Sequence, residues 1–368
     1  MYNILIFGTG STCKLVLNVL NMEKVRILAF LDNDSSKWGD YFYDKKIVPP
    51  SEIYNYLYDY IIIASQYNES IYNQLLHMDL DSKKVLQFYK FYSLLYNPLK
   101  GYMDAYYKKV EELSTIITGI SYARVGIDKN ALINKGYNFA LGSQDLFYDY
   151  KIVEYILNSY KKNKIKYAII GLAYYSFQYD MSLSSMKNRV ILYYRVLGEK
   201  HNYKELSIKD FNNQYNISKN ICDKVFKKNE RGNYLFKWNS SDLSNYSTQE
   251  RINLGKKQAE RDCNKNYPKT VEENKEIFKN YLKLLRDNNI KPIVVVFPAS
   301  KYYTKYFSKR IEGEFHSIIN EFKKEYDFQY IDYFRSGLFE DDDFTDVSHL
   351  NSRGAKKFTQ ILNEEIQW

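Results

Sequence analysis

The stretch NILIFGTG, Asn3–Gly10, decides the fold class, because a short apolar run ends there at two glycines. The next residues, Lys14–Leu20, have helical periodicity, which predicts a strand, a tight turn and a helix in succession. Further strands are expected at Val25–Leu31 and Tyr60–Ala64. Strands that alternate with helices predict a parallel sheet covered by helices.

The alternation weakens around Tyr92–Gly101, where Asn97-Pro98 occurs, so we place a domain boundary there. A fresh series of strands and helices follows. Strands are expected at Thr115–Ile120, Tyr167–Gly171, Pro292–Phe297 and Gln329–Ile331, with a closing helix from about Ser352. The predicted fold is α/β: two parallel-sheet, three-layer domains, a short Rossmann-like one (residues 1–95) and a flavodoxin-like one (residues 96–368).

The polar stretch from about residue 178 to 274 contains few strand signals. Because unstructured loops of that length are uncommon inside compact domains, we expect a helical insertion that serves as a lid or docking region.

Bulk composition excludes several classes of protein. With 368 residues, 45% hydrophobic and 26% charged, and a mean hydropathy of −0.53, the chain is typical of a folded two-domain protein. No apolar run approaches the roughly 20 residues of a membrane helix, and the start lacks a basic segment, so no membrane span and a cytoplasmic location are expected. The three cysteines are far apart and suggest neither disulfides nor a metal site.

The net charge of +9 accompanies very frequent Lys, Tyr, Asn and Ile, as an AT-rich genome would encode. The basic residues are dispersed, without an arginine-rich strip or a recognition-helix pattern, so nucleic acid is not expected as a partner.

Gly8 and Gly10 stand between a strand and a helix, where small residues let a ligand phosphate approach backbone amides. Asp32, at the end of the second strand, lies where a carboxylate would accept hydrogen bonds from ribose hydroxyls. The third glycine of the dinucleotide fingerprint is absent. The alternative is that both glycines only form a tight turn and that Asp32 caps a strand end.

The first 90 or so residues resemble the N-terminal domain of bacterial polysaccharide-biosynthesis proteins, including nucleotide-sugar acetyltransferases. The residues that carry the resemblance are Ile6–Gly10, Phe30–Asp34 with Gly39, Ile47–Pro49 and Tyr58–Ser65. The resemblance implies a glycan pathway and a nucleotide or nucleotide-sugar ligand rather than hydride transfer.

Three residues suggest nucleophilic catalysis. Asp346 stands three residues before His349, close enough for its carboxylate to meet the imidazole and fix its tautomer. Ser121 follows the first strand of the second domain, at the edge where open α/β sheets place their active sites, and Gly119 before it would permit a tight turn. His77, His201 and His316 have no neighbouring constellation.

This pattern resembles the SGNH (GDSL) hydrolase family from about Ile116 to Trp368, most specifically at Asp346–Gly354. The resemblance implies a serine esterase or acyltransferase with Ser121, His349 and Asp346 as its triad, no cofactor required, and an oxyanion hole formed by Gly142 and the side chain of Asn138.

Two departures from the family pattern stand out. No asparagine follows Gly171, where the family's third block has one two residues later, and Ile120 stands where aspartate is common. The segment is closer to divergent SGNH-like proteins associated with acylation of cell-surface polymers, and the missing asparagine puts efficient hydrolysis in doubt.

Purely structural, non-catalytic roles of the same residues are the alternative. Ser121 could be a helix N-cap, and Asp346 could neighbour a helix without catalytic importance. The acidic run Glu340–Asp343 favours a solvated loop over a metal site. Two tyrosine pairs could line a sugar site or pack in the core: Tyr174 with Tyr175, and Tyr302 with Tyr303.

The leading hypothesis is an esterase or O-acyltransferase that acts on a glycan or glycoconjugate. One alternative is a non-catalytic scaffold that binds a nucleotide-sugar through Gly8, Gly10 and Asp32. Another is a transferase of a different group that uses the same pocket.

Overall fold

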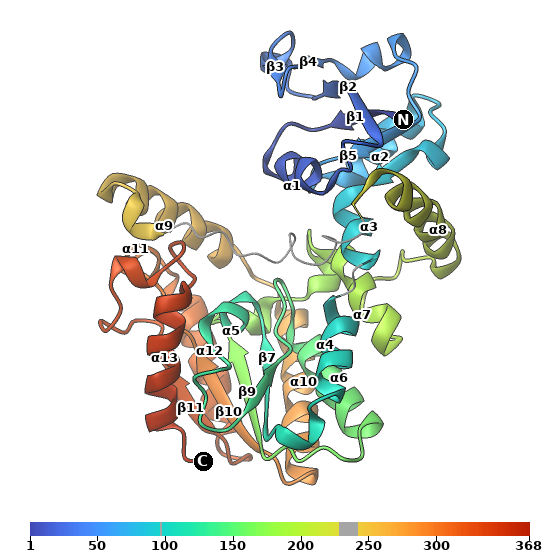
Figure 1. Cartoon of the computed structure of the whole chain (residues 1–368). Helices are drawn as coiled ribbons and strands as arrows, with labels where there is room; N and C mark the ends of the chain where they lie inside the picture. The colour runs from blue at the N-terminus through green and yellow to red at the C-terminus, as the bar shows by residue number, and fades with distance from the viewer. Residues whose placement is uncertain (96–97, 228–241) are drawn as a thin grey trace. The chain divides into compact units, whose positions relative to one another are not determined.

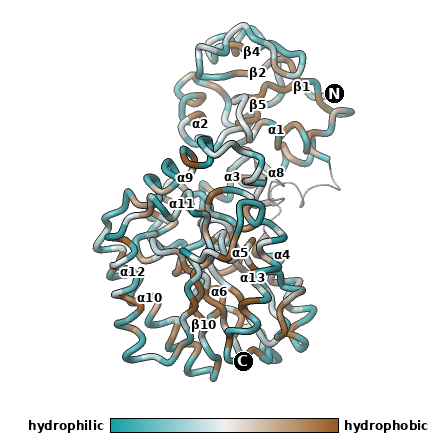
Figure 2. Tube along the Cα trace, turned by 90° about the vertical axis from the view of Figure 1, so that its left-hand side faces the viewer, coloured by the Kyte–Doolittle hydropathy of each residue, from teal (hydrophilic) through white to brown (hydrophobic). Residues whose placement is uncertain are grey.

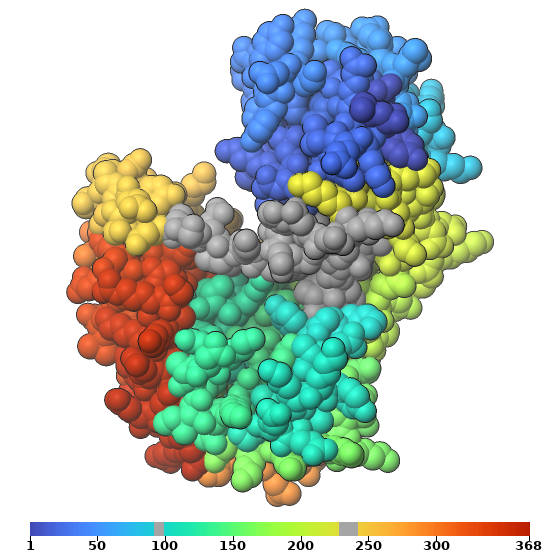
Figure 3. All heavy atoms as spheres, viewed as in Figure 1, coloured from blue at the N-terminus to red at the C-terminus, as the bar shows by residue number. Residues whose placement is uncertain are grey.

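The computed structural model describes residues 1–95, 98–227 and 242–368, which form two compact α/β units. Unit 1 comprises Met1–Gly101 and the described part of Lys204–Trp238, and unit 2 comprises Tyr102–Tyr203 and the described part of Asn239–Trp368. Chain order alone did not suggest that a segment after residue 203 packs with the first unit. Figure 3 shows the yellow-green residues of that segment against the blue and cyan residues of unit 1.

Unit 1 contains a six-stranded sheet of strand order β3-β4-β2-β1-β5-β6. Its strands are β1 (Tyr2–Phe7), β2 (Val25–Leu31), β3 (Tyr41–Phe42), β4 (Lys45–Val48), β5 (Tyr60–Ile63) and β6 (Val85–Gln87). All pairs are parallel except the β3–β4 hairpin, so this sheet is mixed at one edge. The three strands expected from apolar runs are present, whereas the short strands β3, β4 and β6 had too few apolar residues to be expected.

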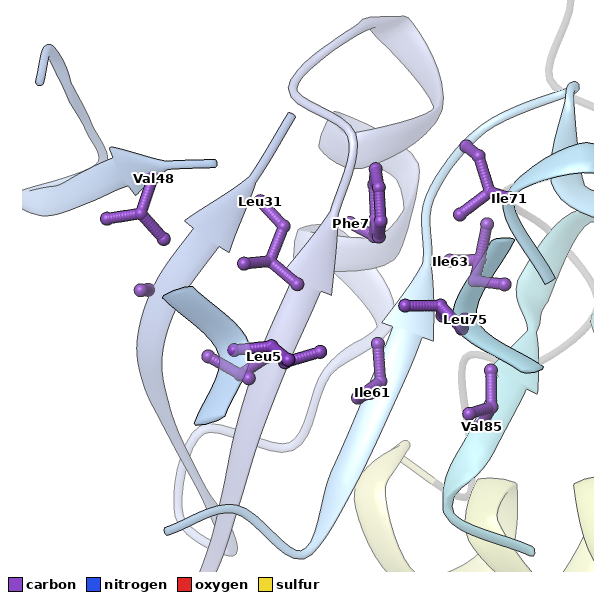
Figure 4. Close-up of a cluster of buried hydrophobic side chains, with 11 residues drawn as sticks. Leu5, Phe7, Leu31, Val48, Ile61, Ile63, Ile71, Leu75 and Val85 are labelled. Atoms are coloured by element: carbon purple, nitrogen blue, oxygen red, sulfur yellow. The ribbon is translucent and has the colours of Figure 1, made fainter. Parts of the chain in front are cut away.

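One hydrophobic cluster of the unit 1 core lies on one face of this sheet. Leu5 and Phe7 of β1, Leu31 of β2, and Ile61 and Ile63 of β5 are nearly or fully buried at alternate positions along their strands. Figure 4 shows these side chains beside Ile71 and Leu75 of the covering helix. Apolar runs in consecutive parallel strands thus build one continuous core.

Four helices surround the unit 1 sheet: α1 (Ser11–Val19), α2 (Asn68–His77), α3 (Phe88–Leu95) and α8 (Ile208–Val225). Helix α8 reaches unit 1 from the second half of the chain, and its Phe211 stacks on Phe91 of α3 with ring centroids 6.0 Å apart. Helix α1 begins at Ser11, three residues before the predicted helix. Helix α4 (Pro98–Tyr107) contains the boundary between the two units.

Unit 2 has a five-stranded, fully parallel sheet of order β11-β10-β9-β7-β8. Its strands are β7 (Thr115–Gly119), β8 (Gly136–Asn138), β9 (Tyr167–Leu172), β10 (Lys291–Val296) and β11 (Gln329–Asp332). The chain passes from β7 to β8 on one side and then to β9 on the other. The strand order therefore reverses between β7 and β9, and such points are where α/β sheets bind ligands.

The helices of unit 2 lie on both faces of the sheet (Figure 1). They are α5 (Ser121–Gly126), α6 (Leu146–Ser159), α7 (Val190–Leu197), α9 (Thr248–Cys263), α10 (Pro268–Asp287), α11 (Lys301–Thr304), α12 (Lys309–Phe322) and α13 (Ser352–Glu365). Helices α6, α10 and α12 are the crossovers into β9, β10 and β11, and right-handed crossovers in one direction place them on one face. Helix α13 packs against α5.

Hydropathy follows this layering, with hydrophobic segments concentrated along the strands, as Figure 2 shows. Within the described ranges, no helix combines the length and the apolar character that a membrane crossing requires.

Candidate active site

Ser121 is the first residue of α5, directly after the turn that ends β7. Gly119 in that turn has φ +135°, a conformation that side chains rarely adopt, and a Cβ there would overlap the carbonyl oxygen of Gly171 on the neighbouring strand. Glycine is also required at position 171, because a Cβ there would lie 2.5 Å from the Cβ of Ala123 in α5. Two glycines on adjacent strands thus let α5 begin directly above the sheet, with Ser121 at its first turn.

His349 lies in a short loop closed by backbone pairing. Phe344 and Leu350 form an antiparallel bridge, and the Thr345 N–H donates to the His349 carbonyl at 2.9 Å. Ser300, just after β10, binds the Val347 carbonyl with its N–H at 3.1 Å and its hydroxyl at 2.7 Å. These bonds fix the loop at the carboxyl edge of the sheet.

The most specific part of the sequence motif, Asp346–Gly354, has a structural explanation at its second end. Asn351 caps α13 by accepting the N–H groups of Arg353 and Gly354, both at 3.0 Å, and its amide donates to the Asp342 carbonyl. A Cβ on Gly354 would overlap the Asp343 carbonyl oxygen. The asparagine and the glycine therefore hold the His349 loop against the start of α13.

The structure brings the three predicted triad side chains into one hydrogen-bonded row. Ser121 Oγ lies 2.8 Å from His349 Nε2, although the residues are 228 positions apart. His349 Nδ1 lies 3.0 Å from each carboxylate oxygen of Asp346. This order, hydroxyl to imidazole to carboxylate, lets the imidazole accept the serine proton while the carboxylate holds the other ring nitrogen in its protonated form.

Asp346 is suited to remain ionised. Burial alone would raise the pKa of its carboxyl group, but the charge and hydrogen bond of His349 and the Ser348 N–H outweigh burial and hold the pKa below its usual range. The side chain of Asp346 is still 48% exposed, whereas that of His349 is only 14% exposed. Water therefore reaches the carboxylate but hardly the imidazole.

The two predicted oxyanion residues have other hydrogen bonds in this structure. The Asn138 amide donates to the Ala123 carbonyl at 2.9 Å, and its oxygen accepts the Ala140 N–H at 2.9 Å, so this side chain ties α5 to the loop after β8. The Gly142 carbonyl accepts a hydrogen bond from the Arg189 guanidinium, a residue the sequence reading missed. Their oxyanion role is not tested by these contacts and stays a proposal.

In unit 1, Gly8, Gly10 and Asp32 meet at the carboxyl ends of β1 and β2. The Asp32 carboxylate accepts the N–H and hydroxyl of Thr9, at 3.2 and 2.5 Å, and pairs with Lys37 at 3.1 Å. Gly8 has φ +104°, and a Cβ there would lie 2.9 Å from the Ala64 carbonyl oxygen, so the turn itself requires this glycine. Gly10 differs, since a Cβ there would meet no atom of the described part of the chain within 4 Å.

Both tyrosine pairs are buried. Tyr174, Tyr175, Tyr302 and Tyr303 expose 8% of their surface or less, which favours packing over an open sugar platform. The expectation that the acidic run forms a solvated loop is wrong for Asp343, which is fully buried and pairs with Lys357 at 3.0 Å and Arg353 at 3.2 Å. The sequence could not show this, because the partners lie on the following helix.

The expectation that His201 has no constellation is also wrong. Its ring lies 3.5 Å from Asp180 and 3.2 Å from Glu273, and with Asp145 and Asp180 it brings three metal-type ligand atoms within 4.8 Å of one another. Asp180 already accepts the Ser182 and Leu183 N–H groups, and Asp145 those of Tyr148 and Met181. Because backbone groups occupy these carboxylates, the cluster is a hydrogen-bonded junction of loops.

We expect His201 to make stability depend on pH. Burial opposes charge on its imidazole, but the hydrogen bond and charge of Asp180 outweigh burial and raise the pKa above its usual value. A raised pKa stabilises the fold fully below the unfolded value of about 6.5, and this contribution is lost as pH rises through the folded-state pKa. The stability gap between the wild type and His201→Gln should therefore be widest in mild acid and narrow at alkaline pH, as urea unfolding at several pH values would measure.

The matched control is His77→Gln, because His77 is exposed on α2. A stability gap of His201→Gln that stays constant with pH, like that of the control, would contradict the charged pairing.

Comparisons with known proteins add the following. Residues 1–86 match the family model described as C2185-like, N-terminal. Among curated proteins no match was found. Among solved structures, a protein of Bacteroides fragilis NCTC 9343 described as a "putative acylhydrolase" is similar at 10% identity and a TM-score of 0.34, over 71% of this chain and 94% of that one. A likeness of this extent does not establish a shared fold or activity.

Proposed function

We propose that unit 2 is a serine-dependent esterase or O-acyltransferase. The observation that carries the proposal is the hydrogen-bonded row of Ser121, His349 and Asp346 at the carboxyl edge of the sheet, where its strand order reverses. Its support is geometric: a nucleophile within hydrogen-bond reach of a base that a third group orients.

The chemistry follows from these positions. Ser121 Oγ attacks the ester carbonyl carbon and His349 Nε2 takes the hydroxyl proton, which gives a tetrahedral intermediate with a negative oxygen. The Ser121 N–H, Gly142 and Asn138 are the proposed donors to that oxygen. The C–O bond to the leaving alcohol then breaks, and His349 returns its proton to the alcohol. Water or a second hydroxyl releases the acyl group by the same steps in reverse.

A sugar hydroxyl is the proposed acceptor, or a sugar ester the proposed substrate. Support for this part comes from unit 1, whose residues resemble the N-terminal domain of polysaccharide-biosynthesis proteins. The direct experiment is labelling with a fluorophosphonate probe, which reacts with activated serines; wild type should be labelled and Ser121→Ala spared.

A second function, a nucleotide-sugar site in unit 1, is favoured by Gly10. The turn explains Gly8, but among the described residues no contact explains Gly10, which caps α1 without a side-chain hydrogen bond and has open space beside the helix N-terminus. Such open space is what a phosphate would need. Asp32, the proposed ribose partner, is bound to Thr9 and Lys37 in this structure, so a ribose would have to displace or share those contacts.

The variant Gly10→Val distinguishes a phosphate site at Gly10 from a glycine that only forms a tight turn. At φ −80° the added side chain causes no backbone strain, so stability without ligand should fall by about 1 kcal/mol or less. A nucleotide-sugar such as a UDP-hexose should raise the melting temperature of wild type but not of this variant, because the side chain would occupy the phosphate position. Equal shifts in both proteins, or none in wild type, would reject the site.

A further inference from the structure

The His349 imidazole contacts the buried side chains of Tyr122 and Ser348 in addition to Ser121 and Asp346. The ring of Tyr122 stacks on the imidazole with centroids 4.7 Å apart and planes 23° from parallel. Ser348 Oγ lies 3.2 Å from His349 Nδ1 and 3.2 Å from Asp346 Oδ1. Tyr122 is 8% exposed and Ser348 2%. The imidazole is thus held on one face and at the Nδ1 edge by groups that water does not reach.

Further buried hydroxyl groups lie beside this contact. The Tyr122 hydroxyl accepts a hydrogen bond from Tyr175 at 3.4 Å. The Tyr303 hydroxyl donates to the Asp262 carboxylate at 3.0 Å. Ser348 donates its single proton to Asp346 and Tyr303 donates its own to Asp262, so each carboxylate holds one of these hydroxyls.

Asp262, the partner of Tyr303, is itself buried and held by a second contact. It is 7% exposed, near the end of α9, and also accepts a 2.7 Å hydrogen bond from Gln258. Helix α9 packs closely against α11. The contact requires glycine at position 255, because a Cβ there would overlap the backbone of Tyr302. The close contact of the two helices keeps Asp262 opposite Tyr303.

The contacts of Tyr122 and Ser348 compensate for the exposure of Asp346 in the triad. Asp346 is half exposed, so water competes for the oxygens that should hold His349. We propose, on the basis of the proposed function, that Tyr122 and Ser348 are positioning residues that keep the imidazole aligned with Ser121. Ser348 directs its proton to Asp346 Oδ1, which leaves Oδ2 for the imidazole N–H, and the Tyr122 ring prevents the imidazole from turning.

Stacking has a further consequence for charge. When His349 takes the proton of Ser121 it becomes a cation, and the face of an aromatic ring attracts a cation in a site from which water is excluded. Tyr122 therefore stabilises the charged form that arises when His349 takes the Ser121 proton.

The test uses Tyr122→Leu and Ser348→Ala in the full chain. The matched control is Tyr106→Phe: Tyr106 is fully buried, and its hydroxyl has no hydrogen-bond partner among the described residues. Two readouts are combined, the rate of fluorophosphonate labelling against pH, and the titration of the His349 ring protons by NMR. The chain has four histidines, so the resonance can be assigned with His349→Gln.

Tyr122→Leu and Ser348→Ala should each slow labelling roughly tenfold, the effect of one lost hydrogen bond or stacking contact, and should move both pH midpoints. Tyr122→Leu should lower them, because it removes the ring that attracts the imidazolium, and Tyr106→Phe should match wild type. Removing the Ser348 hydroxyl leaves Asp346 Oδ1 with more negative charge beside the imidazole, so the midpoints should rise in that variant.

The proposal is overturned if Tyr122→Leu and Ser348→Ala keep the wild-type His349 titration while remaining folded. The NMR readout needs no reaction and decides the positioning role by itself. Absence of labelling in wild type, with a shifted titration in the variants, would instead reject the proposed function and leave the positioning of His349 standing.

Discussion

Ser121→Ala should abolish fluorophosphonate labelling and lower turnover of an activated ester by about 10⁴- to 10⁶-fold, the range seen when a catalytic serine is removed. The reason is that Ser121 Oγ, 2.8 Å from His349 Nε2, is the only atom of the row that can form the covalent bond. Stability should change by about 1 kcal/mol or less, because the substitution removes one partly exposed hydrogen bond.

Ser185→Ala is the matched control, since Ser185 is exposed and outside the row, and it should label like wild type. Asp346→Asn should lose about 10⁴-fold in turnover with the fold intact, because an amide can hold the imidazole in the wrong tautomer. Equal labelling of wild type and Ser121→Ala would discard the acyl-transfer mechanism.

Gly119→Ala should be the most destabilising small substitution near the site, costing about 2–5 kcal/mol. Its φ of +135° strains any side chain, and the new Cβ would overlap the Gly171 carbonyl oxygen, a backbone atom in the centre of the sheet that cannot move aside. Because domains are stable by only about 5–15 kcal/mol, much of unit 2's stability should be lost, along with the placement of Ser121. Urea unfolding measures the change.

Gly313→Ala provides the contrast. Gly313 is exposed in α12 with open space around it, so alanine should leave stability unchanged or raise it by up to about 1 kcal/mol. Similar unfolding midpoints for the two variants would show that the β7 turn tolerates a side chain, contrary to its geometry.

The sequence could predict strands where apolar runs are long and alternate with helices. β1, β2, β5, β7, β9, β10 and β11 all fall on such runs. The short strands could not be predicted. β6 and β8 have only three residues each, and their pairing depends on a neighbouring strand rather than on their own hydrophobicity. The packing of α8 in unit 1 could not be predicted either, because its contact with α3 joins segments that are distant in the sequence.

Some residues of the candidate site could likewise be predicted from local patterns, and others could not. Ser121, Asp346 and His349 could be singled out because each follows a strand or precedes the last helix in a recognisable local pattern, and parallel strands place their carboxyl ends at one edge. Tyr122 and Ser348 had a signal, their adjacency to Ser121 and His349, but nothing local distinguished them from other tyrosines and serines. Asp262 and Arg189 had none, whereas Gly171 was recognised as the glycine of the family's third block.

The sequence by itself determined which segments become strands and helices, and which edge of the second sheet carries reactive side chains, since both follow from periodicity and chain direction. Only the tertiary structure decided that Ser121 Oγ and His349 Nε2 lie 2.8 Å apart, that Asp343 and Asp262 are buried, and that Asn138 and Gly142 are held by Ala123 and Arg189. The physical reason is that hydrogen-bond distances and burial depend on contacts between residues far apart in the chain, which local patterns do not encode.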